Sequence, residues 1–419
     1  MGLRVALVLL GAAALAGGAV VVLRGGAAAR ISAAGQEVVV HTSARTPVVL
    51  EYGLTRAYGL FAGPDAPAHV HRFALPELEP GRTYFVRAGE VESTVSAPPR
   101  PARAALQIAG DHILLDGRPW IPRFTWGSCS AQYAAETAAG VNAFMSSNCG
   151  DSPQTQAAAA LRAGAVVIPA VDQADAELPT TIGTYVKDEP DARNIPPAQL
   201  ASTALPYPAA RGLPVFETLS PKLENAAAYT QVADSIGVDV YPIMNTGDHG
   251  RIVDVASAQR TLEQAAGGKP TFQWIEAIGG VSPRELAAEV WMAICNGARA
   301  FGYWTFGATP FAVDAPTIAA LRNLGTTFDD LAPAIDAAPA QLAVSDPTVN
   351  AFATQLGGAL YVFAVNTSPS STASPSFTLT GLHGRPLGVY GTPRVIGSHG
   401  DGFADTLAAL AWRVYVVAP

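Results

Sequence analysis

The segment from residue 110 to residue 335 alternates short apolar runs with Ala-rich stretches of helical character, and this regularity narrows the choice of folds more than any other feature. Strands that alternate with helices pair in parallel, and eight such units predict a closed (β/α)8 barrel. An open, doubly wound sheet is the alternative, but no Gly-rich phosphate loop follows any of the strands. The predicted strands cover residues 123–127, 142–146, 166–170, 183–187, 214–219, 237–242, 271–277 and 300–306.

Strand-like segments without intervening helices flank the barrel. Four precede it, at residues 37–41, 48–52, 69–75 and 83–88, and several follow it after residue 336. They predict a β-sandwich on each side, and we expect the C-terminal one to pack on the barrel. The predicted divisions are a signal peptide or membrane anchor (1–30), a first sandwich (31–98), a Pro- and Ala-rich linker (99–109), the barrel (110–335) and a C-terminal sandwich (336–419).

The N-terminal segment has the composition of an export signal. Arg4 precedes residues 5–23, which are apolar or Gly throughout, and small residues follow at 25–29. The apolar stretch is also long enough to span a bilayer if it is not cleaved. We therefore expect a protein that is either secreted or anchored on the extracytoplasmic side of a membrane through residues 5–23.

Composition excludes several classes of partner. Hydrophobic residues make up 49% of the chain, charged residues only 14%, and the net charge is −8. A nucleic-acid-binding protein usually has a basic face, so no nucleic-acid partner is expected. No Cys or His spacing indicates a metal site, and no cofactor is expected.

Cys129 and Cys149 both follow predicted strands, so a disulfide and two free thiols remain alternatives, whereas Cys295 is expected in the core.

Two glutamates stand where a barrel enzyme places its catalytic groups. Glu189 follows predicted strand four and Glu276 ends predicted strand seven, and barrel active sites lie at the C-terminal ends of the strands. Glycosidic bond cleavage needs one carboxylic acid to protonate the leaving oxygen and one carboxylate at the oxocarbenium-like centre. The alternatives are a helix-start acid for Glu189 and a buried structural carboxylate for Glu276.

The barrel resembles the clan of glycoside hydrolases with the acid/base on strand four and the nucleophile on strand seven. Residues 115–119, Leu-Asp-Gly-Arg-Pro, fit the hairpin that leads into strand one in that clan. The resemblance implies that Glu189 is the general acid/base and Glu276 the nucleophile of a retaining mechanism. Asp188 stands where the clan usually has an Asn that binds the sugar, and Asp188 is itself an alternative acid.

The first sandwich resembles a fibronectin type III-like domain. Residues 78–87 read LEPGRTYFVR, which matches the strand pattern L-x-P-G-T-x-Y with one extra residue, Arg82. Such a sandwich also precedes the catalytic domain of purple acid phosphatases, but it is a portable module. A metallophosphatase would need clustered metal ligands at strand ends, and the scattered histidines do not supply them.

Further side chains near predicted strand ends are candidates for substrate binding. Aromatic rings stack on sugars but also pack in cores, and a Tyr near strand six either orients Glu276 or packs. The candidates are Trp126, Asn148, Asp188, Glu217, Tyr241 and Trp304.

The sequence thus favours an exported glycoside hydrolase that cleaves O-glycosidic bonds of an extracellular oligo- or polysaccharide. The alternative is a non-catalytic carbohydrate-binding or cell-wall protein on a degenerate barrel.

Overall fold

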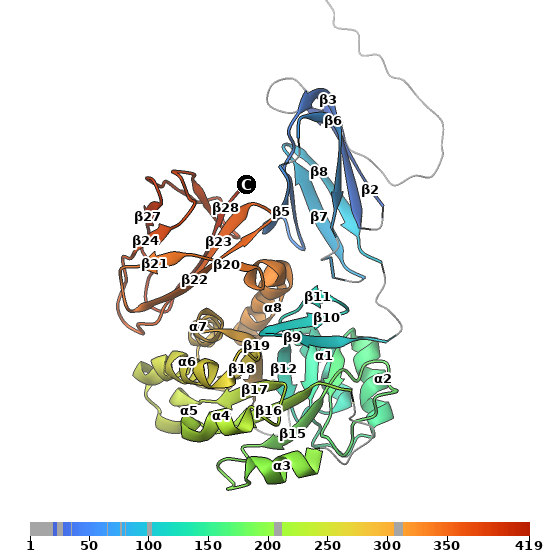
Figure 1. Ribbon diagram of the computed structural model, residues 1–419, viewed down its shortest axis with the longest axis vertical. Helices are drawn as coiled ribbons and strands as arrows, with labels where there is room; N and C mark the ends of the chain where they lie inside the picture. Colours follow the sequence, from blue (N-terminus) through green and yellow to red (C-terminus); the bar gives the residue numbers. More distant parts are fainter. Residues whose placement is uncertain are drawn as a thin grey trace, which may run out of the picture.

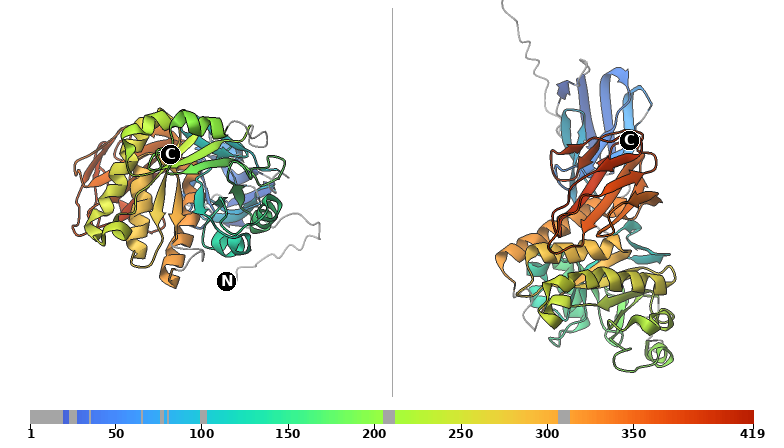
Figure 2. Two further views of the ribbon diagram at one scale, coloured as in Figure 1. Left: turned by 90° about the horizontal axis from the view of Figure 1, so that it is seen from below. Right: turned by 90° about the vertical axis from the view of Figure 1, so that its left-hand side faces the viewer.

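The computed structural model describes residues 20–22 and 28–419, except residues 35, 65, 76–77, 80, 99–102, 205–211 and 306–312. The described chain forms a barrel and two antiparallel sandwiches (Figure 1). Both sandwiches lie on the same side of the barrel, as the views in Figure 2 confirm. A central barrel, with antiparallel sheets before and after it in the sequence, is the architecture that the sequence predicted.

The barrel contains eight parallel strands in the order β14-β13-β12-β19-β18-β17-β16-β15. Parallel bridges between Val167 and Thr181 and between Ala170 and Tyr185 connect β14 to β15, so the sheet closes on itself. Each predicted strand is present. The bounds are β12 (Arg123–Trp126), β13 (Ala143–Met145), β14 (Val166–Ile168), β15 (Thr184–Asp188), β16 (Val215–Leu219), β17 (Ser235–Asp239), β18 (Thr271–Glu276) and β19 (Ala298–Trp304).

Helices cover the outside of the barrel. Ser282 and Glu285 form a capping box at the start of one helix, and Asp314 caps another by accepting the Thr317 amide, which satisfies amides that lack a partner in the first turn. Residues 169–183, between β14 and β15, contain no helix. The helices are α1 (Tyr133–Ala138), α2 (Pro153–Ala163), α3 (Pro197–Ala204), α4 (Ala226–Tyr229), α5 (Pro242–Thr246), α6 (Asp254–Ala266), α7 (Pro283–Cys295) and α8 (Ala315–Ile335), with short 3-10 turns at Ser130–Gln132, Leu223–Asn225 and His249–Val253.

Aromatic side chains fill the barrel interior. The rings of Phe124, Phe216 and Phe272 contact one another, and Trp274 packs against Phe124 and Phe272. Successive residues of a strand face opposite sides of a sheet, so these rings define which positions of β16 and β18 point inward. A hairpin of β9 (Leu106–Ala109), β10 (His112–Leu115) and β11 (Arg118–Pro119) adds side chains to the same core.

The N-terminal sandwich consists of two four-stranded sheets. Tyr84 accepts a hydrogen bond at its hydroxyl from the Glu79 amide at 3.0 Å, the kind of tyrosine corner found in immunoglobulin-like sandwiches. The identity as a fibronectin type III-like domain stays a prediction. The sheets are β1 (Val20–Val22), β2 (Ala28–Ala34), β3 (Glu37–Thr46) and β6 (Ala68–Ala74), and β4 (Leu50–Gly53), β5 (Leu60–Ala62), β7 (Thr83–Ala88) and β8 (Val91–Ser96).

The predicted export segment falls mostly outside the described residues. Only residues 20–22 and 28–30 of it are described, and these belong to the paired strands β1 and β2. Across the part of the chain that the structure describes, no helix is long and apolar enough to cross a membrane.

The C-terminal sandwich packs on α7 and α8, as expected. Trp291 of α7 stacks on Trp412 of this sandwich and on Phe328 of α8, with ring centroids 4.9 Å apart in both pairs. The sheets are β20 (Ala338–Ala340), β22 (Val349–Leu356), β23 (Ala359–Asn366), β28 (Trp412–Val417), β25 (Leu387–Val389) and β26 (Val395–Ile396), and β21 (Leu342–Val344), β24 (Ser376–Leu379) and β27 (Gly402–Ala404).

The helix α8 connects all three parts. Asp330 accepts hydrogen bonds from the Leu54 amide of the first sandwich and from the Tyr390 hydroxyl of the second, both at 2.6 Å. Its neighbour Asp329 pairs with Arg123, the first residue of β12, at 2.5 Å. Two adjacent carboxylates on one helix therefore join the barrel to both sandwiches.

Candidate active site

The C-terminal ends of β15 and β17 bring two carboxyl groups together. Glu189 directly follows β15, and Asp239 is the last residue of β17. The backbone of Glu189 has a φ of 44°, in the left-handed region that non-glycine residues rarely adopt and that is common at functional sites. Its amide donates to the Thr218 carbonyl at 3.0 Å, which fixes this turn to the neighbouring strand.

The carboxyl groups of Glu189 and Asp239 lie close enough for their charges to interact. Burial of Asp239, with the nearby charges of Glu189 and Asp188, raises the pKa of Asp239 to about 9. Asp239 therefore keeps its proton at neutral pH.

Aromatic side chains surround this carboxyl pair. Tyr185 donates from its hydroxyl to Asp188 at 3.3 Å, and Arg193 pairs with the other oxygen of Asp188 at 2.9 Å. Burial and the nearby carboxylates of Asp239 and Asp188 raise the pKa of Tyr241 well above its ordinary value. Tyr241 is therefore a neutral hydrogen-bonding group beside the pair, and its ring lies 5.1 Å from that of Trp304.

Glu276, the second predicted catalytic residue, is held differently. Its side chain is fully buried, and its two carboxylate oxygens accept hydrogen bonds from the amides of Ile243 at 3.1 Å and Met244 at 2.6 Å. Burial raises the pKa of Glu276, and the two amide bonds partly oppose that rise. The structure thus places Glu276 at the predicted strand end but engages both of its oxygens with the backbone of α5.

Glu217, a further candidate on β16, does not share the inward face of its neighbours. Its neighbours Phe216 and Thr218 face the barrel interior, where Trp274 donates to the Thr218 hydroxyl at 2.9 Å. By strand alternation Glu217 points outward, as does Leu219, which packs against the outer helices. Glu217 is fully buried there, and burial together with the charge of Asp191 raises its pKa to about 8.

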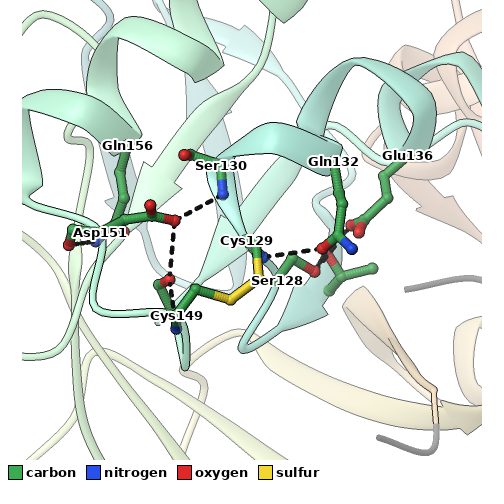
Figure 3. Close-up of a disulfide and its surroundings, with 10 residues drawn as sticks. Ser128, Cys129, Ser130, Gln132, Glu136, Cys149, Asp151 and Gln156 are labelled. Atoms are coloured by element: carbon green, nitrogen blue, oxygen red, sulfur yellow. Dashed lines mark hydrogen bonds between the residues drawn. A yellow bond between two sulfur atoms is a disulfide. The ribbon is translucent and has the colours of Figure 1, made fainter. Parts of the chain in front are cut away.

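The remaining candidates, Trp126 and Asn148, lie at the end of β12 and in the loop after β13. Trp126 is half-buried against the barrel core. Asn148 is exposed, and its amide donates to the Gly127 carbonyl at 3.1 Å. A disulfide between Cys129 and Cys149, with Cα atoms 5.4 Å apart, joins the two loops and settles the question that the sequence left open (Figure 3). Asp151 strengthens this junction by accepting the Ser130 amide at 2.8 Å.

Sequence reasoning missed Asp239. The signal was present, because an apolar run ends in Asp-Val-Tyr-Pro at predicted strand six. The catalytic candidates came from strands four and seven, so Asp239 at the end of strand six was not among them. Among the described residues, no group of three or more His, Cys, Asp or Glu side chains is arranged to hold a metal ion.

The fold and the site define a multidomain (β/α)8-barrel protein with an acidic centre at the C-terminal ends of its strands. No protein-family model matches the chain, and no curated protein matches it. Among solved structures, an α-amylase from Geobacillus thermoleovorans, complexed with acarbose, aligns with a TM-score of 0.52 and 11% identity, over 72% of this chain and 98% of that one. This likeness confirms the barrel fold.

Two other solved structures are similar over more of the chain. A family 39 glycoside hydrolase from Bacteroides cellulosilyticus WH2 aligns with 92% of this chain and 98% of its own, at a TM-score of 0.46 and 11% identity. A family GH30 endoxylanase from Clostridium papyrosolvens C71 aligns with 76% of this chain and 100% of its own, at a TM-score of 0.44 and 12% identity.

Proposed function

We propose that this protein is an exported glycoside hydrolase that cleaves O-glycosidic bonds of an extracellular oligo- or polysaccharide. The observation that carries the proposal is the placement of two neighbouring carboxyl groups, Glu189 and Asp239, at the C-terminal ends of β15 and β17. The raised pKa of Asp239 keeps an acid beside a second carboxyl group near neutral pH, and glycosidic cleavage requires an acid and a carboxylate.

In the proposed mechanism the pair acts by double displacement. Asp239, which keeps its proton near neutral pH, protonates the glycosidic oxygen as the bond to the anomeric carbon breaks, and the Glu189 carboxylate attacks that carbon. Water then attacks the glycosyl ester, and Asp239 accepts its proton. Inversion needs carboxyl groups roughly 6.5–9.5 Å apart with a water between them, whereas retention uses about 5–5.5 Å.

The surrounding side chains suit a sugar ligand. Trp304 and Trp126 offer aromatic faces near the ends of β19 and β12, and aromatic faces stack on the C–H surface of sugar rings. Tyr241 and Asp188 supply a neutral donor and an acceptor for hydroxyl groups beside the acid pair. We assign these four side chains to substrate binding, together with Asn148 in the loop after β13.

The disulfide at the mouth of the barrel supports export, as does the composition of the N-terminal segment. Disulfides persist in oxidising compartments and are rare in the cytosol. The bond between Cys129 and Cys149 lies in the loops that shape the proposed site, so folding of that site suits an extracytoplasmic environment.

The test is a panel of polysaccharides and aryl-glycosides assayed with the purified protein and three isosteric variants. We expect Glu189→Gln and Asp239→Asn each to lower kcat/KM by roughly 10²–10⁴, the usual contribution of a positioned acid or base. Glu217→Gln is the matched control: it changes a buried carboxyl of β16 that faces away from the mouth, so activity should be unchanged.

Turnover that survives both Glu189→Gln and Asp239→Asn would refute the assignment. Sugar binding without turnover by the wild-type protein on every substrate would instead establish a non-catalytic carbohydrate-binding protein.

A further inference from the structure

The short helix α5 begins immediately after Tyr241, and its first turn has no capping side chain of its own. Tyr241 occupies the N-cap position without a side-chain cap bond, and Pro242, at the first helical position, has no N–H to donate. The next amides of a first turn have no partner within the helix. In α5 these are the amides of Ile243 and Met244.

Glu276, the last residue of β18, supplies the missing cap of α5. Its carboxylate accepts the Ile243 amide at 3.1 Å and the Met244 amide at 2.6 Å. The backbone of Glu276 is fixed in turn, because its own amide donates to the carboxyl of Glu289, a fully buried residue of α7, at 3.1 Å. A chain of contacts therefore runs from α7 through β18 to Ile243 and Met244, which follow Tyr241 by two and three residues.

We propose that Glu276 is a positioning residue that fixes Tyr241 against the Glu189–Asp239 pair, and that it is not the nucleophile. This inference rests on the proposed function of that pair. Capping fixes the first turn of α5, and the turn fixes the backbone of Tyr241, whose ring lies 5.1 Å from that of Trp304 and whose hydroxyl is close enough to feel the charge of Asp239.

The burial of Glu276 supports this role. A nucleophile must reach the anomeric carbon of a substrate in the mouth. The side chain of Glu276 has no exposed surface, and both of its oxygens already accept backbone hydrogen bonds. Attack by this carboxylate would require the first turn of α5 to detach.

A double-mutant cycle tests whether Glu276 acts through Tyr241. The variants are Glu276→Gln, Tyr241→Phe and the double variant, assayed for kcat and KM on an aryl-glycoside that the wild-type protein cleaves. Gln presents an N–H to one of the two amides, so we expect Glu276→Gln to lower kcat about tenfold, and the double variant to match Tyr241→Phe within about twofold, because coupled residues are non-additive. Multiplicative losses, or wild-type kinetics for Glu276→Gln, would overturn the proposal.

Azide rescue separates positioning from covalent catalysis. Where a carboxylate nucleophile has been removed, azide can attack the anomeric carbon in its place, and the product is a glycosyl azide. We expect no rescue of Glu276→Ala and rescue of Glu189→Ala. A glycosyl azide formed by Glu276→Ala would overturn the proposal.

Hydrogen exchange tests the cap without relying on activity. We expect the amides of Ile243 and Met244 to exchange at least about tenfold faster in Glu276→Gln, while the α7 amides stay protected. Unchanged exchange would refute the capping role. A wild-type protein without turnover on any substrate, but with this exchange result, would refute the proposed function and leave the cap established.

Discussion

The hydroxyl of Tyr390 provides a sharp test of how the three parts of the molecule hold together. Tyr390→Phe removes one oxygen and no packing volume, and that oxygen donates to Asp330 at 2.6 Å. Burial raises the pKa of Asp330 to about 6, against the lowering effect of the bonds from Tyr390 and Leu54. The strength of the lost bond therefore depends on whether Asp330 is ionised.

The magnitude and its pH dependence follow from that pKa. Above about pH 6 Asp330 is charged, and a hydrogen bond to a charged group contributes about 1.5–3 kcal/mol. Below about pH 6 the hydrogen bond joins Tyr390 to a neutral Asp330 and contributes about 0.5–1.5 kcal/mol. Because the folded-state pKa exceeds the ordinary value of 3.8, this carboxyl contributes stability that is lost as pH rises from about 4 to 6. Removing the Tyr390 bond raises that pKa further and enlarges the loss.

The assay is thermal unfolding of Tyr390→Phe and wild type at pH 5 and pH 8. We expect Tm to fall by several degrees at pH 8 and by less at pH 5. Tyr303→Phe is the matched control, since Tyr303 is buried but its hydroxyl has no hydrogen-bond partner among the described residues. Equal losses at both pH values, or an equal loss in Tyr303→Phe, would refute the reasoning.

Three further predictions concern the site and its supports. Activity should fall as pH rises through about 9, because Asp239 then loses its proton; a pH–rate profile in which Asp239→Asn keeps that limb would contradict this. Replacing Cys129 and Cys149 with Ser opens a cross-link across a sequence separation of 20, which should lower stability by about 3 kcal/mol, and reductant should affect the wild type but not the double variant. Gly237→Ala would place a methyl group 2.0 Å from the Phe272 ring, so we expect a loss of about 1–3 kcal/mol or more in denaturant unfolding, whereas Gly279→Ala, which meets no atom within 4 Å, should cost far less.

The barrel could be predicted because each of its strands is a short apolar run at regular spacing, and parallel pairing follows from the helices between them. The four strands expected in the first sandwich were found, but β1, β2, β5 and β8 were missed. Strand β5 has only three residues, Leu60–Ala62, too few to show an alternating pattern.

The site was harder to predict because it depends on direction as well as position. A shift of one residue reverses the face that a strand side chain occupies, and this separates Glu217, which points outward, from Thr218, which points inward. Glu276 stands at the predicted strand end, but its oxygens contact α5, a helix that the sequence analysis did not anticipate.

The arrangement of the three parts also bears on substrate access. Arg123 begins β12 and pairs with Asp329, which also contacts Arg82 of the first sandwich at 3.5 Å. That sandwich therefore meets the barrel at the N-terminal ends of its strands, whereas Glu189 and Asp239 lie at the C-terminal ends. Residues on the two ends of a barrel serve different purposes, stability at one and chemistry at the other. The contacts of Asp329 and Asp330 thus stabilise the assembly from the side opposite the acid pair, and a long polysaccharide would approach the pair without passing the first sandwich.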